Sequence, residues 1–169
     1  MTISMYQASF YPLSRMLKNV IEILEKGQAH AEAKNIDPTV LLNSRLYPDM
    51  FPLVRQIQIV SDVSRRAIAR LAGVEAPAIE DTETTFPELI DRLKKTIIYL
   101  ETFTAEQIDG AEEKDITIPI GREETMTMKG WPFLVHFALP NFYFHVTTAY
   151  DILRHNGVEV GKRDFLGKP

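Results

Sequence analysis

Two pairs of polar side chains could carry chemistry, and the members of each pair are four residues apart. One pair is Asn141 and His145, and the other is Gln58 and Asp62. Residues at i and i+4 share one face of an α-helix, so each pair would point the same way from its helix. An imidazole can bind a metal ion or act as a general base, and nearby amides or carboxylates can orient the imidazole or a substrate. These four residues therefore predict a small polar pocket around His145.

The same residues also fit a purely structural role, and the sequence leaves both interpretations open. A buried polar group without a partner costs about 1–3 kcal/mol, so these side chains must bond to one another or to a ligand. In the structural interpretation, His145 is a core histidine hydrogen-bonded to an amide across the helices. A metal site without cysteine usually has two or three imidazoles or carboxylates. Here one imidazole, His145, stands among the amides of Asn141 and Gln58.

The remaining three histidines are less well placed for such a site. His136 comes nine residues before His145 and would approach it only if the helix restarts at Pro140. His155 lies in the last turn of the expected helix, where a cation suits the helix C-terminus. His30 follows a glycine near the end of the first long helix, which favours a solvated polar face.

Long amphipathic helices must position the two polar pairs. Apolar residues recur at three- and four-residue steps along four stretches, which predicts helices over residues 10–34, 50–72, 86–100 and 131–156. Pro52 is expected in the first turn of the second helix, where its missing N–H costs nothing. Pro12 and Pro140 are expected to kink or restart their helices. Between the third and fourth stretches the pattern alternates over residues 115–120 and 125–128, with a turn at 121–124, which predicts a β-hairpin.

Local signals place the ends of these elements. Asp37 followed by Pro38 opens a short helical turn, and Gly73 suits the C-cap of the second long helix. Thr85 and Glu88 have the spacing of a capping box at the start of the third helix. The tail from residue 161 to 167 is expected to be irregular. The predicted fold is an all-α, antiparallel four-helix bundle with a small β-hairpin between helices 3 and 4, in one domain over residues 1–169.

Composition excludes several classes of function. The chain has 169 residues with 19 Lys+Arg against 23 Asp+Glu, which gives a net charge of −4, and it has no cysteine. A disulfide framework or thiolate metal site is therefore excluded, and the mildly acidic balance argues against a nucleic-acid partner. No apolar run is long enough to span a membrane and no signal peptide is visible, so we expect a cytoplasmic protein. Arg65–Arg66 and Lys94–Lys95 are expected to be solvated charges.

Several blocks of the sequence resemble the DUF1993 family. These blocks cover residues 45–52, 71–74, 82–86, 138–150, 153–157 and 161–167. The resemblance implies the DinB/YfiT-like metalloenzyme superfamily, whose four-helix bundles often dimerise. Members typically bind a divalent metal through one histidine on the second helix and a His-x-x-x-His pair on the fourth. In this chain His145 takes the place of the second histidine of that pair and Asn141 the first, while the second-helix position falls near Gln58, with Gln56 left possible.

The resemblance and the residues together suggest three functions. The first is a bundle protein of unknown activity with a polar pocket around His145 and a degenerate metal site. The second is a non-catalytic dimeric binding or stress-response module, and the third is a hydrolase or thiol transferase that depends on a divalent metal. Whether the protein is an enzyme stays open. If a metal is bound, His145 is the expected ligand and Zn, Ni, Mn or Fe the expected ion. The expected partners are a second copy of the chain and an unidentified small molecule.

Overall fold

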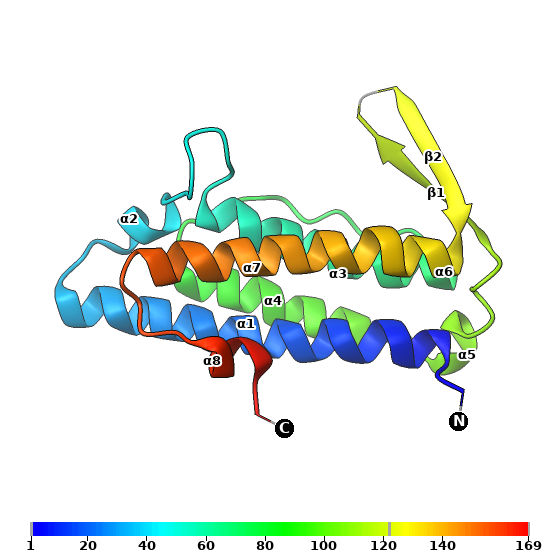
Figure 1. The fold of residues 1–169 in the computed structure, drawn as a ribbon, viewed down its shortest axis with the longest axis horizontal. Helices are drawn as coiled ribbons and strands as arrows, with labels where there is room; N and C mark the ends of the chain where they lie inside the picture. The colour runs from blue at the N-terminus through cyan, green and yellow to red at the C-terminus, as the bar shows by residue number, and fades with distance from the viewer. Residues whose placement is uncertain (1, 122, 169) are drawn as a thin grey trace.

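Four long helices lie side by side along most of the molecule's length (Figure 1). The computed structural model describes residues 2–121 and 123–168. The long helices are α1 (Met5–Lys34), α3 (Leu53–Ala72), α4 (Phe86–Leu100) and α7 (Leu139–His155). The mostly helical character predicted from the apolar periodicity is therefore confirmed. None of the helices in the described residues is both long and apolar enough to cross a membrane.

Helix α1 begins earlier than predicted and passes through Pro12 without a break. Ser4 is its N-cap, and Ser4 and Gln7 form a capping box. Tyr6 stacks on Phe10, with 4.9 Å between the ring centroids, one turn before the proline. The expectation that the helix would restart at Pro12 is wrong, because the cap already fixes the first turns upstream of it. The other end stops at Asn35, which adopts the left-handed conformation.

The predicted ends of the next helices are largely confirmed. Asp37 caps the short helix α2 (Pro38–Leu42) by accepting a hydrogen bond from the Thr39 amide. Gly73 is the C-cap of α3 with φ +77°, a conformation that favours glycine. Pro52 is the N-cap of α3 and not part of its first turn. Thr85 forms the expected capping box at the start of α4.

Helices α3 and α4 run in the same direction (Figure 1). Their C-terminal ends both reach the short helix α5 (Ala105–Ile108): α4 leads into α5, and α3 packs against it. The predicted antiparallel arrangement is wrong for this pair. The connection between the two helices, residues 73–85, can extend to about 43 Å at ~3.3 Å per residue, more than the ~30 Å length of α3. The segment therefore returns along the helix before α4 begins.

The last long helical stretch contains a widened turn just before Pro140. It starts as α6 (Gly130–Pro132), continues as the π-helical segment η1 (Phe133–Ala138) and leads into α7. Pro140 has no N–H to donate to a carbonyl one α-turn earlier, and its ring needs space there. The wider π turn accommodates both effects, and such turns are frequent at functional sites.

A two-stranded antiparallel hairpin precedes this stretch, as predicted. Strands β1 (Asp115–Ile120) and β2 (Glu124–Lys129) pair in one register, with Ile116 opposite Met128 and Ile118 opposite Met126. Ile116 and Ile118 are buried, which anchors β1 to the helices. The predicted turn includes residue 122, which lies outside the described residues. The tail is not wholly irregular, because residues 162–166 form the short helix α8 (Lys162–Leu166), whose Asp164 pairs with Lys26 at 2.6 Å.

Candidate functional site

His145 is buried between α7 and α3, with 9% of its surface exposed. Its Nδ1 lies 2.6 Å from the Oε1 of Gln56 on α3. Of the two glutamines that the sequence left open, Gln56 therefore faces the imidazole and Gln58 does not. The Nε2 of Gln56 donates a hydrogen bond of 3.0 Å to the Phe51 carbonyl. His145 and Gln56 thus form a two-step chain that ends on the backbone just before α3.

This chain determines which nitrogen of His145 carries the proton. A backbone carbonyl can only accept, so the Gln56 amide must direct its nitrogen to Phe51 and its oxygen to His145. The Nδ1 atom therefore donates, and Nε2 of the neutral ring holds a lone pair. Burial, followed by the positive charge of Arg55, lowers the pKa of His145. Both effects favour a neutral imidazole at pH 7, with Nε2 available as a hydrogen-bond acceptor or base.

Gln58 and Asp62 belong to a different set of contacts. Gln58 accepts a hydrogen bond from Arg55 at 3.3 Å and donates one to Glu83 at 3.0 Å. Asp62 pairs with Arg65 at 2.6 Å, among other arginines. Asp62 is therefore not the group that orients the imidazole of His145, and Gln56 takes that role. The i, i+4 spacing correctly placed both side chains on one polar face, but not toward His145.

Two arginines beside the site are buried, and the sequence analysis did not predict their burial. Arg65 is 1% exposed and Arg92 is 2% exposed, although we expected Arg65 to be solvated. Arg92 contacts Asp62 and Asp81 at 3.0 Å each and Glu83 at 2.9 Å. Burial opposes the charge of Arg92, but Glu83 and then the two aspartates outweigh it and raise its pKa.

A signal for these arginines exists in the sequence. Arg92 follows Leu89 by three residues and precedes Thr96 by four, so it stands on the buried line of α4. Arg65 stands three residues before the buried Ile68 on α3. The acidic segment between the two helices supplies the matching carboxylates. Two arginines on buried lines and an acidic connection between them predict an internal ion-pair network.

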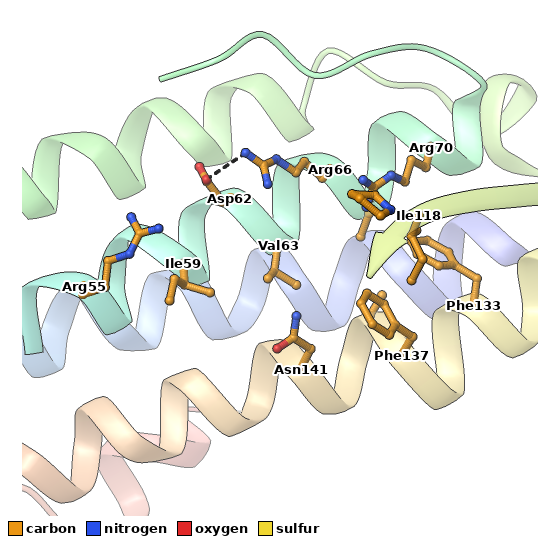
Figure 2. Close-up of a pocket in the computed structure, with 13 residues that line it drawn as sticks. Arg55, Ile59, Asp62, Val63, Arg66, Arg70, Ile118, Phe133, Phe137 and Asn141 are labelled. Atoms are coloured by element: carbon orange, nitrogen blue, oxygen red, sulfur yellow. Dashed lines mark ion pairs between the residues drawn. The ribbon is translucent and has the colours of Figure 1, made fainter. Parts of the chain in front are cut away.

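A pocket of about 220 Å³ lies beside this network, between α3, η1, the start of α7 and strand β1 (Figure 2). Its α3 side carries Arg55, Asp62, Arg66 and Arg70. The remaining wall is mostly apolar, and it is formed by Ile59, Val63, Ala67, Ile118, Pro119, Phe133, Phe137 and Ala138. The π-helical segment therefore contributes directly to the pocket, as its two phenylalanines stand against α3.

Asn141 lines this pocket, one turn along α7 from His145. Figure 2 shows its amide directed toward α3. Among the described residues, the Asn141 side chain makes no hydrogen bond within the protein. The pocket was predicted around His145, but His145 contacts Gln56 and does not line it. Of the other predicted pocket residues, Asn141 and Asp62 line it and Gln58 does not.

The residues at the expected metal positions do not fit a divalent cation. The oxygen of Gln56 already accepts from His145, and its nitrogen is held by Phe51. Asn141 offers only an amide, which is a weak ligand for zinc or iron. Within residues 2–121 and 123–168, no group of three or more His, Asp or Glu side chains has the arrangement of a metal site. His30 lines a separate hollow and His136 is exposed on η1, so neither replaces a missing ligand.

Comparison with known proteins identifies the family. The family model described as "Domain of unknown function (DUF1993)" matches residues 5–166. The chain belongs to the DUF1993 family. This assignment confirms the resemblance seen in the sequence blocks. Comparison with curated proteins finds no match.

A solved relative of this DUF1993 protein carries the same fold. The crystal structure is of a DinB family member protein from Shewanella denitrificans, with 45% sequence identity and a TM-score of 0.89. The match covers 97% of this chain and 92% of that chain. The DinB-like character implied by the sequence is therefore confirmed as well. This likeness concerns family and fold, and the activity must be argued from the site.

Proposed function

We propose that this DUF1993 protein is a small-molecule-binding protein that works without a resident divalent metal. The observation that carries the proposal is the bond between His145 Nδ1 and Gln56 Oε1, with the Gln56 nitrogen held by Phe51. This pair of hydrogen bonds occupies the side chain of Gln56 at the second-helix ligand position. It leaves one nitrogen of the His145 imidazole, Nε2, for a ligand. We take α1, α3, α4 and α7 to form a DinB-type four-helix bundle whose metal position has become a hydrogen-bonded pair.

The role proposed for His145 is to accept a hydrogen bond from the ligand through Nε2. Its lowered pKa keeps the ring neutral at pH 7, so that Nε2 retains its lone pair. Gln56 fixes the tautomer in the way that outer-shell groups fix metal-bound histidines. Asn141, one turn away, adds a polar group to the neighbouring pocket. A ligand group that reaches Nε2 of His145 would need an N–H or O–H donor, whereas contacts in the neighbouring pocket do not require one.

The same geometry supports a second candidate, an enzyme in which His145 acts as a general base. A neutral imidazole with a free Nε2 can take a proton from a bound substrate. The hydrolase or thiol transferase that depends on a metal is less well supported, because the described donors do not fit the ion. The dimeric binding or stress-response module is compatible with the main proposal. Its homodimer and the cytoplasmic location both stay predictions.

Restoring the expected ligands provides the test. The double variant Q56H/N141H would add two imidazoles beside His145. Asn141 is at the position that the family resemblance assigns to the first histidine, and Gln56 is chosen over Gln58 because it contacts His145. We expect the double variant to bind Zn²⁺ with near one-to-one stoichiometry in a calorimetric titration, whereas the wild-type protein and H145A do not. If wild-type protein binds Zn²⁺ one-to-one and H145A loses that binding, the proposal of a metal-independent site is wrong.

A further inference from the structure

The pocket beside Asn141 is positively charged on one wall and apolar on the other. Arg66 and Arg70 stand four residues apart on α3, and Arg55 lies near the start of the same helix (Figure 2). Phe133 and Phe137 of η1 line the opposite side. Residues at i and i+4 share a helix face, so the guanidinium groups of Arg66 and Arg70 are near neighbours.

The carboxylates around the pocket neutralise two of these three arginines. Arg55 pairs with Asp81, and Arg66 pairs with Asp62 at 3.2 Å. In the described part of the chain, Arg70 has neither an ion pair nor a side-chain hydrogen bond. Glu75 shares the adjoining hollow with Arg66 and Arg70, but no ion pair joins it to either one within the described residues. The pocket therefore has an uncompensated cationic group on its wall.

Asp62 neutralises Arg66 only in part, because its carboxylate is shared with the buried arginine network. It already contacts Arg65 at 2.6 Å and Arg92 at 3.0 Å, and these two arginines are buried away from solvent. Its negative charge is thus shared among three guanidinium groups. Burial is the main cause that lowers the pKa of Arg70, and the like charge of Arg66 is the second. Both disfavour the charged form, so keeping the charge has a free-energy cost. An anion in the pocket would offset that cost.

The size of the pocket limits the ligand to one small ring or a short chain. Its volume of about 220 Å³ lies below the roughly 300–1,000 Å³ of typical drug-sized sites but above the ~150 Å³ of a cavity that holds benzene. Phe137, which is half-buried, offers an apolar surface that such a ring would pack against, and the buried Phe133 packs behind it. The Asn141 amide supplies a further polar contact on the α7 side.

We propose that this pocket binds a small organic carboxylate, with the carboxylate held by Arg70 and Arg66 and the apolar part packed against the apolar wall around Phe137. Guanidinium groups recognise carboxylates through paired N–H donors, which gives orientation as well as attraction. The inference names the ligand class for the proposed small-molecule function and rests on it. It uses different residues from the His145–Gln56 pair, so each can fail separately.

Sodium benzoate and its neutral isostere benzamide provide matched probes for an NMR titration of ¹⁵N-labelled protein. We expect benzoate to shift the amide resonances of residues around Arg70 and Phe137, with benzamide binding about tenfold more weakly or worse, since it lacks the charge-assisted hydrogen bonds. R70M keeps the apolar stem and removes the charge, and it should weaken benzoate binding by about tenfold. R154M makes the same charge change on an exposed site at the end of α7 and should leave binding unchanged.

The spectra of R70M also show whether the variant is folded, and R70K keeps the charge and should retain measurable benzoate binding. Equal binding of benzoate and benzamide would overturn the carboxylate inference while leaving the small-molecule function intact. Unchanged benzoate binding in R70M would overturn it too, because the charge would then lie elsewhere. No shift of the pocket resonances with either probe would overturn the pocket as the ligand site. The Zn²⁺ titration of the wild-type protein and H145A separately decides the metal-independent part of the proposed function.

Discussion

A single hydrogen bond sets the chemical state of His145. Gln56 fixes the proton on Nδ1, and burial keeps the ring neutral at physiological pH. The folded protein therefore binds fewer protons at this position than the unfolded chain does, over the pH range between the two pKa values. Linkage then requires the free energy of unfolding to fall as the pH drops below the ordinary histidine value of about 6.5.

The variant H145Q cannot titrate and should lack this part of the pH dependence. We expect wild-type protein to lose more unfolding free energy than H145Q between about pH 7.5 and about pH 5.5, because only the wild type must charge its imidazole on unfolding. Urea unfolding of both proteins at each pH measures the difference, and the carboxylates titrate alike in both. Parallel losses in the two proteins would show that His145 keeps its ordinary pKa.

At the scale of elements, the buried arginines connect α3, α4 and the acidic segment between them. Asp62 on α3 contacts Arg65 of its own helix and Arg92 of α4, while Asp81 and Glu83 reach Arg92 from the segment. This network holds residues 73–85 along the helices and so permits α3 and α4 to run in parallel. It also orders the polar wall of the pocket, since Asp62 lines it.

Removing the shared carboxylate should be strongly destabilising. D62A leaves two buried guanidinium groups short of a counter-charge, and breaking a buried pair in this way typically costs about 3–5 kcal/mol. Urea unfolding at pH 7 measures the change. D91A breaks the exposed i, i+4 pair with Lys95 on α4 and should have little effect. A small change in D62A, comparable to that in D91A, would mean that the network contributes little to stability.

Gly130, at the junction of β2 and α6, is required by close backbone packing. A Cβ built at this position would lie 1.9 Å from the Ala111 carbonyl oxygen, which is backbone and cannot rotate away. We expect G130A to lower the free energy of unfolding by about 1–3 kcal/mol or more, as overpacking does. G161A is the matched control, because a Cβ there meets nothing within 4 Å. Equal thermal stability of the two variants would contradict this account.

The elements were predictable to the extent that their signals are local. Apolar periodicity and caps such as Thr85 and Gly73 depend on neighbouring residues, and these predictions are confirmed. The direction of α4 depends on how residues 73–85 pack, which no local pattern reports. Gln56 and Gln58 stand on the same short stretch of α3, and only the packing of α7 decides which one meets His145. The buried state of Arg65 likewise depends on the acidic segment that folds over it.

For the whole molecule, the exposed aromatic residues of the last helical stretch bear on assembly. Phe144 is 57% exposed and Trp131 is 47% exposed, and an apolar residue of this size on the surface is a common feature of interfaces. The expected homodimer can be tested by sedimentation velocity at micromolar concentration. We expect the wild-type protein to be a dimer. The variant F144D should shift it toward the monomer, because the new carboxylate would be buried against the partner subunit. A clean monomer for wild-type protein would contradict the expected dimer.

The central claim concerns the whole molecule as well: this DinB-like protein has a hydrogen-bonded His145–Gln56 pair in place of a metal centre. Elemental analysis of protein purified without an affinity tag or chelator tests it most directly, with H145A measured alongside. The account predicts no near-stoichiometric zinc, nickel, manganese or iron in either protein. One metal ion per chain in the wild type, absent from H145A, would contradict it and would make His145 a metal ligand.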